Sequence, residues 1–185
     1  MVVGPDRSEH DGVGGVDRYA GKWPVIDDHD NPDVVSDKHA SGLDHHECHA
    51  VDHSNGDDVS DFEGAKRIVQ SALDEWGRLD VLVNNAGILR AGYFEDLSVQ
   101  THHREIDINV KGVVNGVHAA FPHLKATKRS VVVNLSSASA IYGQSELANY
   151  SATKFFVRGL PEALDLEWAR HGIRVVAIWP LFVET

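Results

Sequence analysis

Short apolar runs alternate with longer segments of helical periodicity, and this alternation constrains the fold of the chain more than any other feature. The apolar runs lie at 79–83, 130–135 and 173–178. Helical spacing of apolar residues predicts helices at about 60–76, 99–124 and 149–170. Strands that alternate with helices are typical of parallel βαβ units with right-handed crossovers. We therefore expect an α/β fold with a doubly wound parallel sheet.

Capping residues set the expected ends of these helices. Ser60 and Glu63 have the spacing of a capping box, which predicts that Ser60 is the N-cap of the first helix. Gly77 is a natural residue to end that helix, because glycine adopts the left-handed conformation without strain. Pro161 lies inside the third predicted helix, where it should bend or destabilise the helix because its ring removes a backbone hydrogen bond.

The length and composition favour one globular domain and exclude several classes of protein. The 185 residues contain no apolar run that could span a membrane and no apolar N-terminal stretch of the signal-peptide type. The one cysteine, Cys48, suits a reducing compartment, and we expect a cytoplasmic protein without membrane partners. A net charge of −11 argues against nucleic acid as a partner, because phosphate contacts require clustered Lys and Arg.

Most of the excess acidic charge lies in residues 1–57, which differ in character from residues 58–185. We treat residues 1–57 as an atypical acidic segment rich in His and Asp. Their best strand fragments are very short, at Val2-Val3, Val25-Ile26 and Val34-Val35. Such a segment buries too little apolar area to offset its ordering entropy, so disorder is one interpretation. Translation from a shifted reading frame is another, which the coding DNA would test.

Two patterns in this segment suggest ligand sites, and neither is persuasive. Possible metal ligands cluster at His45, His46, Glu47, Cys48 and His49. Adjacent residues cannot all face one ion, so we predict no metal site. The glycines of 11–16 lack the spacing of a phosphate-binding loop, and no strand precedes them.

Polar or turn-forming residues follow each of the three predicted strands. They are Asn84-Asn85-Ala86-Gly87, Ser136-Ser137 and Pro180. Each alone also fits a bland role as a turn, a helix cap or the end of a strand. In open parallel sheets, however, ligands bind beyond the carboxyl ends of the strands. The three motifs together therefore indicate a binding site at that edge.

Tyr150 and Lys154 are four residues apart at the start of the third predicted helix, so they share one face of it. A phenol alone titrates near pH ~10 and exchanges protons poorly at neutral pH. A neighbouring cation favours the phenolate and lowers the phenol pKa. The pair is therefore a candidate general acid/base. Taken alone, the same spacing also fits a surface tyrosine stacked on a lysine stem.

With these motifs in this order, residues 58–185 resemble the short-chain dehydrogenase/reductase family. The resemblance implies a Rossmann-like fold and hydride transfer between NAD(H) or NADP(H) and an alcohol or carbonyl. It implies that Tyr150 exchanges a proton with the substrate oxygen, and that Lys154 lowers the tyrosine pKa and binds the nicotinamide ribose. Ser137 would hydrogen-bond the substrate oxygen. Asn109 would hold a water molecule in the proton relay.

The resemblance also implies a cofactor site and an oligomer. Asp58 would contact the adenine, while Asn84, Ala86 and Gly87 would line the cofactor site. Pro180 and Thr185 correspond to the ends of the family motif P-G-x-x-x-T, in which Thr185 would contact the carboxamide. The implied partners are a small-molecule substrate and further copies of the chain, as a homodimer or homotetramer.

The chain departs from the family at both ends. Residues 1–57 contain no glycine loop of the form T-G-x-x-x-G-x-G, so the sheet is expected to be incomplete and the preference for NAD or NADP cannot be read. Leu181 replaces the glycine of the C-terminal motif, and the substrate-covering region is absent. If the first strands are missing, the strand at 79–83 should be an exposed edge. The alternative function is an inactive pseudoenzyme or fragment that acts at most as a dimerising module.

Overall fold

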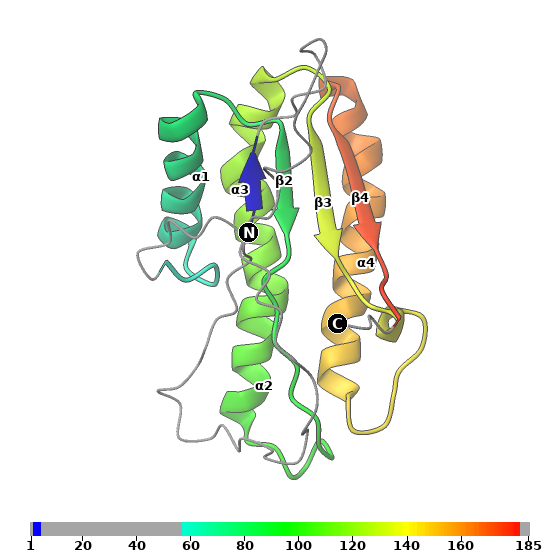
Figure 1. Ribbon diagram of the computed structural model, residues 1–185. Coiled ribbons are helices and arrows are strands. Elements are labelled where there is room, and N and C mark those ends of the chain that lie inside the picture. The colour runs from blue at the N-terminus through cyan, green and yellow to red at the C-terminus, as the bar shows by residue number, and fades with distance from the viewer. Residues whose placement is uncertain (1, 5–56, 182–185) are drawn as a thin grey trace, which may run out of the picture. The chain divides into compact units, whose positions relative to one another are not determined.

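The computed structural model describes residues 2–4 and 57–181 (Figure 1). The predicted acidic segment therefore lies almost wholly outside the described residues. So do the metal candidates at 45–49, the glycines of 11–16, and Thr185. Among the described residues, no helix is long and apolar enough to cross a membrane.

Four strands form one sheet in the order β1-β2-β3-β4. They are β1 (Val2–Gly4), β2 (Val81–Asn84), β3 (Val131–Leu135) and β4 (Arg174–Ile178). The last three are parallel, and the register places Asn84 beside Asn134. The three strands read from apolar runs are confirmed to within two residues at each end. The parallel α/β sheet is confirmed with them.

The strand β1 corrects the expectation that the strand at 79–83 would be an exposed edge. Val2–Gly4 pair with Val81–Val83 in antiparallel fashion, so the outer side of β2 is occupied. The fragment Val2-Val3 was visible in the sequence as a short β-branched run. Its pairing partner was not, because a run this short carries no register information.

Helices connect the strands. They are α1 (Phe62–Trp76), α2 (Val99–Ile106), α3 (Gly112–Ala126) and α4 (Ala148–Trp168). A π-helix, Asp107–Lys111, joins α2 to α3 without a break, and 3₁₀ turns occupy Ala138–Ala140 and Ala169–His171. The sequence predicted one regular helix at 99–124, and the π-helix inside it was not predicted. The helix α4 continues through the buried Pro161 over all 21 of its residues.

The start of α1 differs from the predicted capping box. Asp61 is the N-cap, and its carboxylate accepts from the backbone N–H of Gly64 at 3.0 Å. Ser60 instead donates its hydroxyl to Asp58, so the stronger acceptor takes the cap. Gly77 ends the helix in the left-handed conformation, at φ 71°, as predicted.

The core lies on the face of the sheet that α3 and α4 cover (Figure 1). Leu82, Val132 and Val175 are buried there, with alternate residues of each strand pointing to this face. They pack against apolar residues of α1 and α3, including Val69 and Leu124. This packing fixes the strand ends, where the polar motifs begin.

Candidate active site

Buried asparagines join the carboxyl ends of the three parallel strands. The Asn84 side chain donates to the side-chain oxygen of Asn134 at 2.9 Å, and Asn134 donates to the carbonyl of Val176 at 3.2 Å. Both asparagines are at most 5% exposed, so these bonds satisfy groups that water cannot reach. Asn84 was predicted from its motif. Asn134 was missed, although a lone Asn inside a run of valines was a signal.

Asn109 lies in the π-helix and is 1% exposed. Its side-chain oxygen accepts from the N–H of Ile88 at 2.8 Å, and its amide donates to the carbonyl of Ile88 at 2.8 Å. The amide also donates to the Thr153 hydroxyl at 3.0 Å. Asn109 therefore holds the loop after β2 against α4 through direct bonds. The expected water-holding role belongs to the proposals below.

Lys154 lies beneath this loop with only 7% of its surface exposed. Its ammonium donates to the carbonyl of Leu135 at 3.0 Å and lies 5.5 Å from the ring centroid of Tyr150. Burial lowers the pKa of Lys154 to about 8, against an opposing effect of the Glu105 carboxylate. The lysine therefore stays mostly charged at neutral pH but loses its proton more easily than an exposed lysine.

The phenol of Tyr150 does not show the lowered pKa that the sequence predicted. Burial raises its pKa above the ordinary value; the Ser137 side chain acts in the opposite direction, and Glu105 raises the pKa further. Lys154 is not among the groups that shift the phenol. The physical reason is that its ammonium is directed to the carbonyl of Leu135 and lies beside the ring rather than against the oxygen.

The serines after β3 serve two purposes. The Ser137 hydroxyl accepts from the N–H of Ser139 at 3.1 Å, which caps the following 3₁₀ turn. The Ser136 hydroxyl donates to the carbonyl of Lys154 at 2.9 Å and so fastens α4 to the end of β3. Pro180 follows β4, and its carbonyl accepts from the N–H of Ala138 at 2.9 Å. The motifs after β3 and β4 are therefore adjacent, as predicted.

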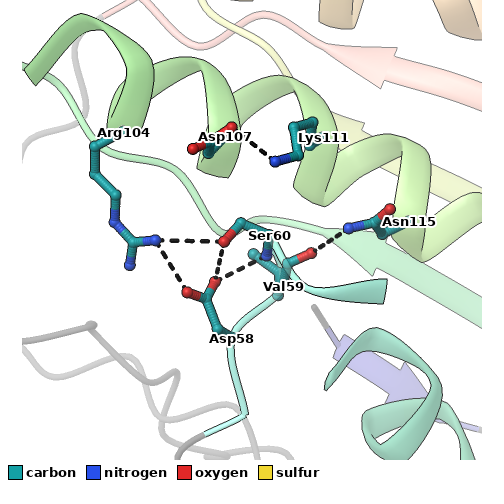
Figure 2. A network of polar contacts seen from close by, with 7 residues as sticks. All are labelled: Asp58, Val59, Ser60, Arg104, Asp107, Lys111 and Asn115. Atoms are coloured by element: carbon teal, nitrogen blue, oxygen red, sulfur yellow. Dashed lines mark hydrogen bonds and ion pairs between the residues drawn. The ribbon is translucent and has the colours of Figure 1, made fainter. Parts of the chain in front are cut away.

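Asp58 forms part of a separate polar network at the start of α1 (Figure 2). One carboxylate oxygen accepts from the N–H and hydroxyl of Ser60, at 2.8 and 2.7 Å, and the other accepts from Arg104 at 2.9 Å. Burial alone would raise the pKa of Asp58, but these hydrogen bonds outweigh it and the pKa is lowered. Asn115 donates to the Val59 carbonyl at 2.9 Å. Sequence reasoning missed both Arg104 and Asn115.

A small hollow lies between this network and the end of β2. Its lining consists of Val59, Asn84, Ala86, Gly112 and Val113. Nearby, a Cβ on Gly87 would lie 3.2 Å from Asn109 Oδ1 and 3.5 Å from Lys154 Nζ. The loop backbone therefore passes close to the lysine head because this position carries no side chain. Among residues 57–181, no group of three metal-ligating side chains occurs.

Comparison with known proteins settles the family. The sequence pattern described as short chain dehydrogenase matches residues 38–185. The chain belongs to the short-chain dehydrogenase family. This family match begins at residue 38, before the boundary predicted at 58.

Individual short-chain dehydrogenases show the same relationship. Oxidoreductase UcpA of Salmonella typhimurium is 34% identical over 188 residues, covering 100% of this chain and 69% of that protein. A 3-ketoacyl-(acyl-carrier-protein) reductase from Brucella melitensis complexed with NADH is 34% identical with a TM-score of 0.64, covering 67% of this chain and 53% of the other. A gluconate 5-dehydrogenase from Burkholderia cenocepacia in complex with NADP and tartrate is 30% identical with a TM-score of 0.65, covering 69% of this chain and 50% of the other.

The chain thus spans about half the length of these solved short-chain dehydrogenases. It shares their Rossmann-like architecture. The family consists of oxidoreductases, and its solved members are bound to NADH in one case and NADP in another.

Proposed function

We propose that this protein transfers hydride between NAD(H) or NADP(H) and a small alcohol or carbonyl substrate, with Tyr150 as the general acid/base. The observation that carries the proposal is the convergence of Tyr150, Ser137 and Lys154 at the end of β3. Ser137 is close enough to the phenol to lower its pKa, and Lys154 lies beside the phenol ring. This edge of the sheet is where ligands bind in such folds.

Ser137, Tyr150 and Asn109 each have a task that their chemistry allows. Ser137 donates a hydrogen bond to the substrate oxygen and stabilises the charge that develops there. Tyr150 gives its proton to that oxygen during reduction and accepts one from the hydroxyl during oxidation. Asn109 holds the loop and α4 in register, and we assign to it the support of a water molecule that resupplies the proton.

The residues present fit the nicotinamide half of the cofactor. An ammonium has three N–H donors, and Lys154 uses one of them on Leu135, which leaves donors for the ribose hydroxyls. Gly87 leaves the space beside Lys154 open, and the hollow beside Val59 and Ala86 lies next to Asp58, which we assign to the adenine. NAD(P) supplies the redox chemistry, and the protein positions it. Pro180 and Thr185 are assigned to the carboxamide side.

The pyrophosphate half of the site has no residues assigned to it. We therefore keep the inactive form as a second candidate, in which the fold serves as a dimerising module. Exposed apolar residues on two helices support this candidate, with Val114 on α3 at 41%, Phe155 on α4 at 41% and Leu166 on α4 at 81%. Both candidates include a cytoplasmic homodimer or homotetramer, and both treat residues 1–57 as a separate segment.

Titration of the purified chain with NADH and NADPH, followed by fluorescence, separates the two candidates. Saturable binding together with reduction of a carbonyl substrate that Tyr150→Phe abolishes supports the proposed enzyme. Tyr142→Phe is the matched control, because Tyr142 is 60% exposed. Absence of saturable binding to either nucleotide contradicts the proposed enzyme and favours the inactive form.

A further inference from the structure

Glu105 is a buried carboxylate that the mechanism above does not use. It lies on α2 with 1% of its surface exposed. One oxygen accepts from the backbone N–H of Arg90 at 3.0 Å, and the other accepts from the side-chain amide of Asn149 at 2.6 Å. These contacts join the loop after β2, the helix α2 and the start of α4.

A buried carboxylate is unusual at a position where the side chain only has to pack against its neighbours. Both oxygens act as acceptors, as expected of an ionised carboxylate. In the part of the chain that the structure describes, no Lys or Arg forms an ion pair with Glu105, so two neutral N–H donors contact the carboxylate directly and the Lys154 ammonium acts on its charge only from a longer distance. Burying a charge in this way is costly, and an apolar side chain would pack at lower cost. A role in packing alone therefore does not account for the carboxylate.

The Glu105 carboxylate contacts the first turn of α4, the turn that carries Tyr150. Asn149 immediately precedes Tyr150 and also donates to the carbonyl of His102 at 3.2 Å, so α2 supplies two acceptors to one amide. Leu147 is the N-cap of α4, and no side chain among the described residues caps this helix end. The contacts from α2 therefore hold the first turn of α4 through the Asn149 side chain, at a helix end that lacks a side-chain cap.

We propose that Glu105 is a positioning residue for Tyr150. Its carboxylate holds Asn149 and the backbone of Arg90, and thereby fixes the phenol relative to the loop that follows β2. The proposal rests on the proposed function for the role of Tyr150, but the contact itself exists without cofactor or substrate.

The electrostatic surroundings support this assignment. The Glu105 charge raises the pKa of both Tyr150 and Lys154, so it favours the proton-bearing form of each. Among residues 57–181, His102 on α2 and Arg90 in the loop reach this group of side chains through backbone atoms, and the charge of Lys154 on α4 interacts with that of Glu105. Only Lys154 lies beside the phenol ring.

The test compares Glu105→Gln with the original chain in the absence of cofactor. Glutamine keeps the size of the side chain and removes the charge. Its NH₂ group cannot accept a hydrogen bond, so one of the two donors, the Arg90 N–H or the Asn149 amide, loses its acceptor. We expect amide hydrogen exchange in the first turn of α4 to rise about tenfold or more. We also expect the Tyr150 phenol pKa, followed by the ¹³C resonance of its ring and assigned with Tyr150→Phe, to fall. Glu162→Gln is the control, because Glu162 lies on α4 with a 64% exposed side chain.

A second substitution makes the test specific. In the double variant Glu105→Gln with Asn149→Asp, the donor and acceptor are exchanged and the charge returns. We expect exchange and the phenol pKa to move back toward those of the original chain. If Glu105→Gln does not fold, Asn149→Ala breaks the same contact from α4 and should raise exchange there.

Unchanged exchange and an unchanged phenol pKa in Glu105→Gln would overturn the proposal, and so would failure of the double variant to recover either. These readouts need no turnover. An inactive chain that shows the expected shifts would therefore contradict the proposed function while leaving the role of Glu105 intact.

Discussion

The side-chain amide of Asn109 donates a hydrogen bond of 3.0 Å to the hydroxyl of Thr153, joining the π-helix to the helix that carries Tyr150. The Thr153 hydroxyl in turn donates to the carbonyl of Tyr150 at 2.7 Å. With its two bonds to Ile88, Asn109 connects the loop after β2 to the first turn of α4. The Asn109 amide is therefore one of the groups that set the geometry of the candidate site, together with the Glu105 carboxylate.

Replacing this amide should destabilise the fold. We expect Asn109→Ala to lower the free energy of unfolding by about 3 kcal/mol, because it leaves the partly buried N–H of Ile88 without its acceptor and removes two further bonds. Urea denaturation measures the change. Asn85→Ala is the control, since Asn85 is exposed in the neighbouring motif. Equal stability losses in the two variants would contradict the structural role of Asn109.

Tyr150→Phe should abolish turnover and leave the fold intact. The phenol oxygen is the proposed proton donor, and general acid/base catalysis contributes at least about 100-fold to a rate. Cofactor oxidation measures the rate, and circular dichroism shows whether the fold is kept. A variant that retains activity comparable to Tyr142→Phe would refute the assignment of Tyr150.

The outline of the fold was readable from the sequence because it depends on periodicity. The strands at 79–83, 130–135 and 173–178 are largely apolar runs, and the helices carry regular apolar stripes, so both signals are strong. The cap of α1 was misassigned because Asp58, Ser60 and Asp61 are all suitable acceptors. Only their spatial relation to Arg104 decides which one caps the helix.

Lys154 should make stability depend on pH. Its pKa is lowered from 10.5 to about 8 by burial, so between these values the unfolded chain binds more protons than the folded chain. The free energy of unfolding should therefore rise with pH across this window, by about 3 kcal/mol from this residue. Below pH ~8 both states hold the proton and the burial cost is fully present.

Substitution isolates this contribution. Lys154→Met removes the charge at similar length, so its advantage over the original chain should shrink as pH rises from about 8 to about 10. Denaturation at several pH values gives the comparison. Lys66→Met serves as the control, because Lys66 is half exposed. Parallel stability curves for the original chain and Lys154→Met would show that the lysine is not buried in its charged form.

Two glycines should respond to alanine in opposite directions. A Cβ on Gly64 would lie 2.4 Å from the backbone oxygen of Asp58, so Gly64→Ala should destabilise the chain by about 1–3 kcal/mol. A Cβ on Gly159, inside α4, would meet no atom within 4 Å, so Gly159→Ala should stabilise it by about 0.5–1 kcal/mol. Thermal melting of both variants measures the change, and midpoint shifts of the same sign in both variants would contradict the prediction.

The sequence predicted residues of the candidate site only where they follow the end of a strand or are spaced to share a helix face. Ser137 and Asn84 were found because they follow apolar runs, and Tyr150 and Lys154 because they share a helix face. Glu105 and Asn134 contact residues 44 and 50 positions away, respectively, and no local pattern predicts such contacts. The phenol pKa was misjudged because it depends on burial and on where the ammonium points.

The π-helix at Asp107–Lys111 also fixes the length of this segment. Each residue of a regular α-helix turns the chain by about 100°, so one residue more or fewer between α2 and α3 would rotate one helix against the other by that amount. Such a rotation would turn Glu105 away from Asn149, or it would turn Gly112 away from Val59. Gly112 packs so closely on Val59 that a Cβ at position 112 would lie 2.8 Å from the valine methyl. We therefore expect single-residue insertions and deletions to be tolerated in the loop at 95–97 but not between His102 and Gly112.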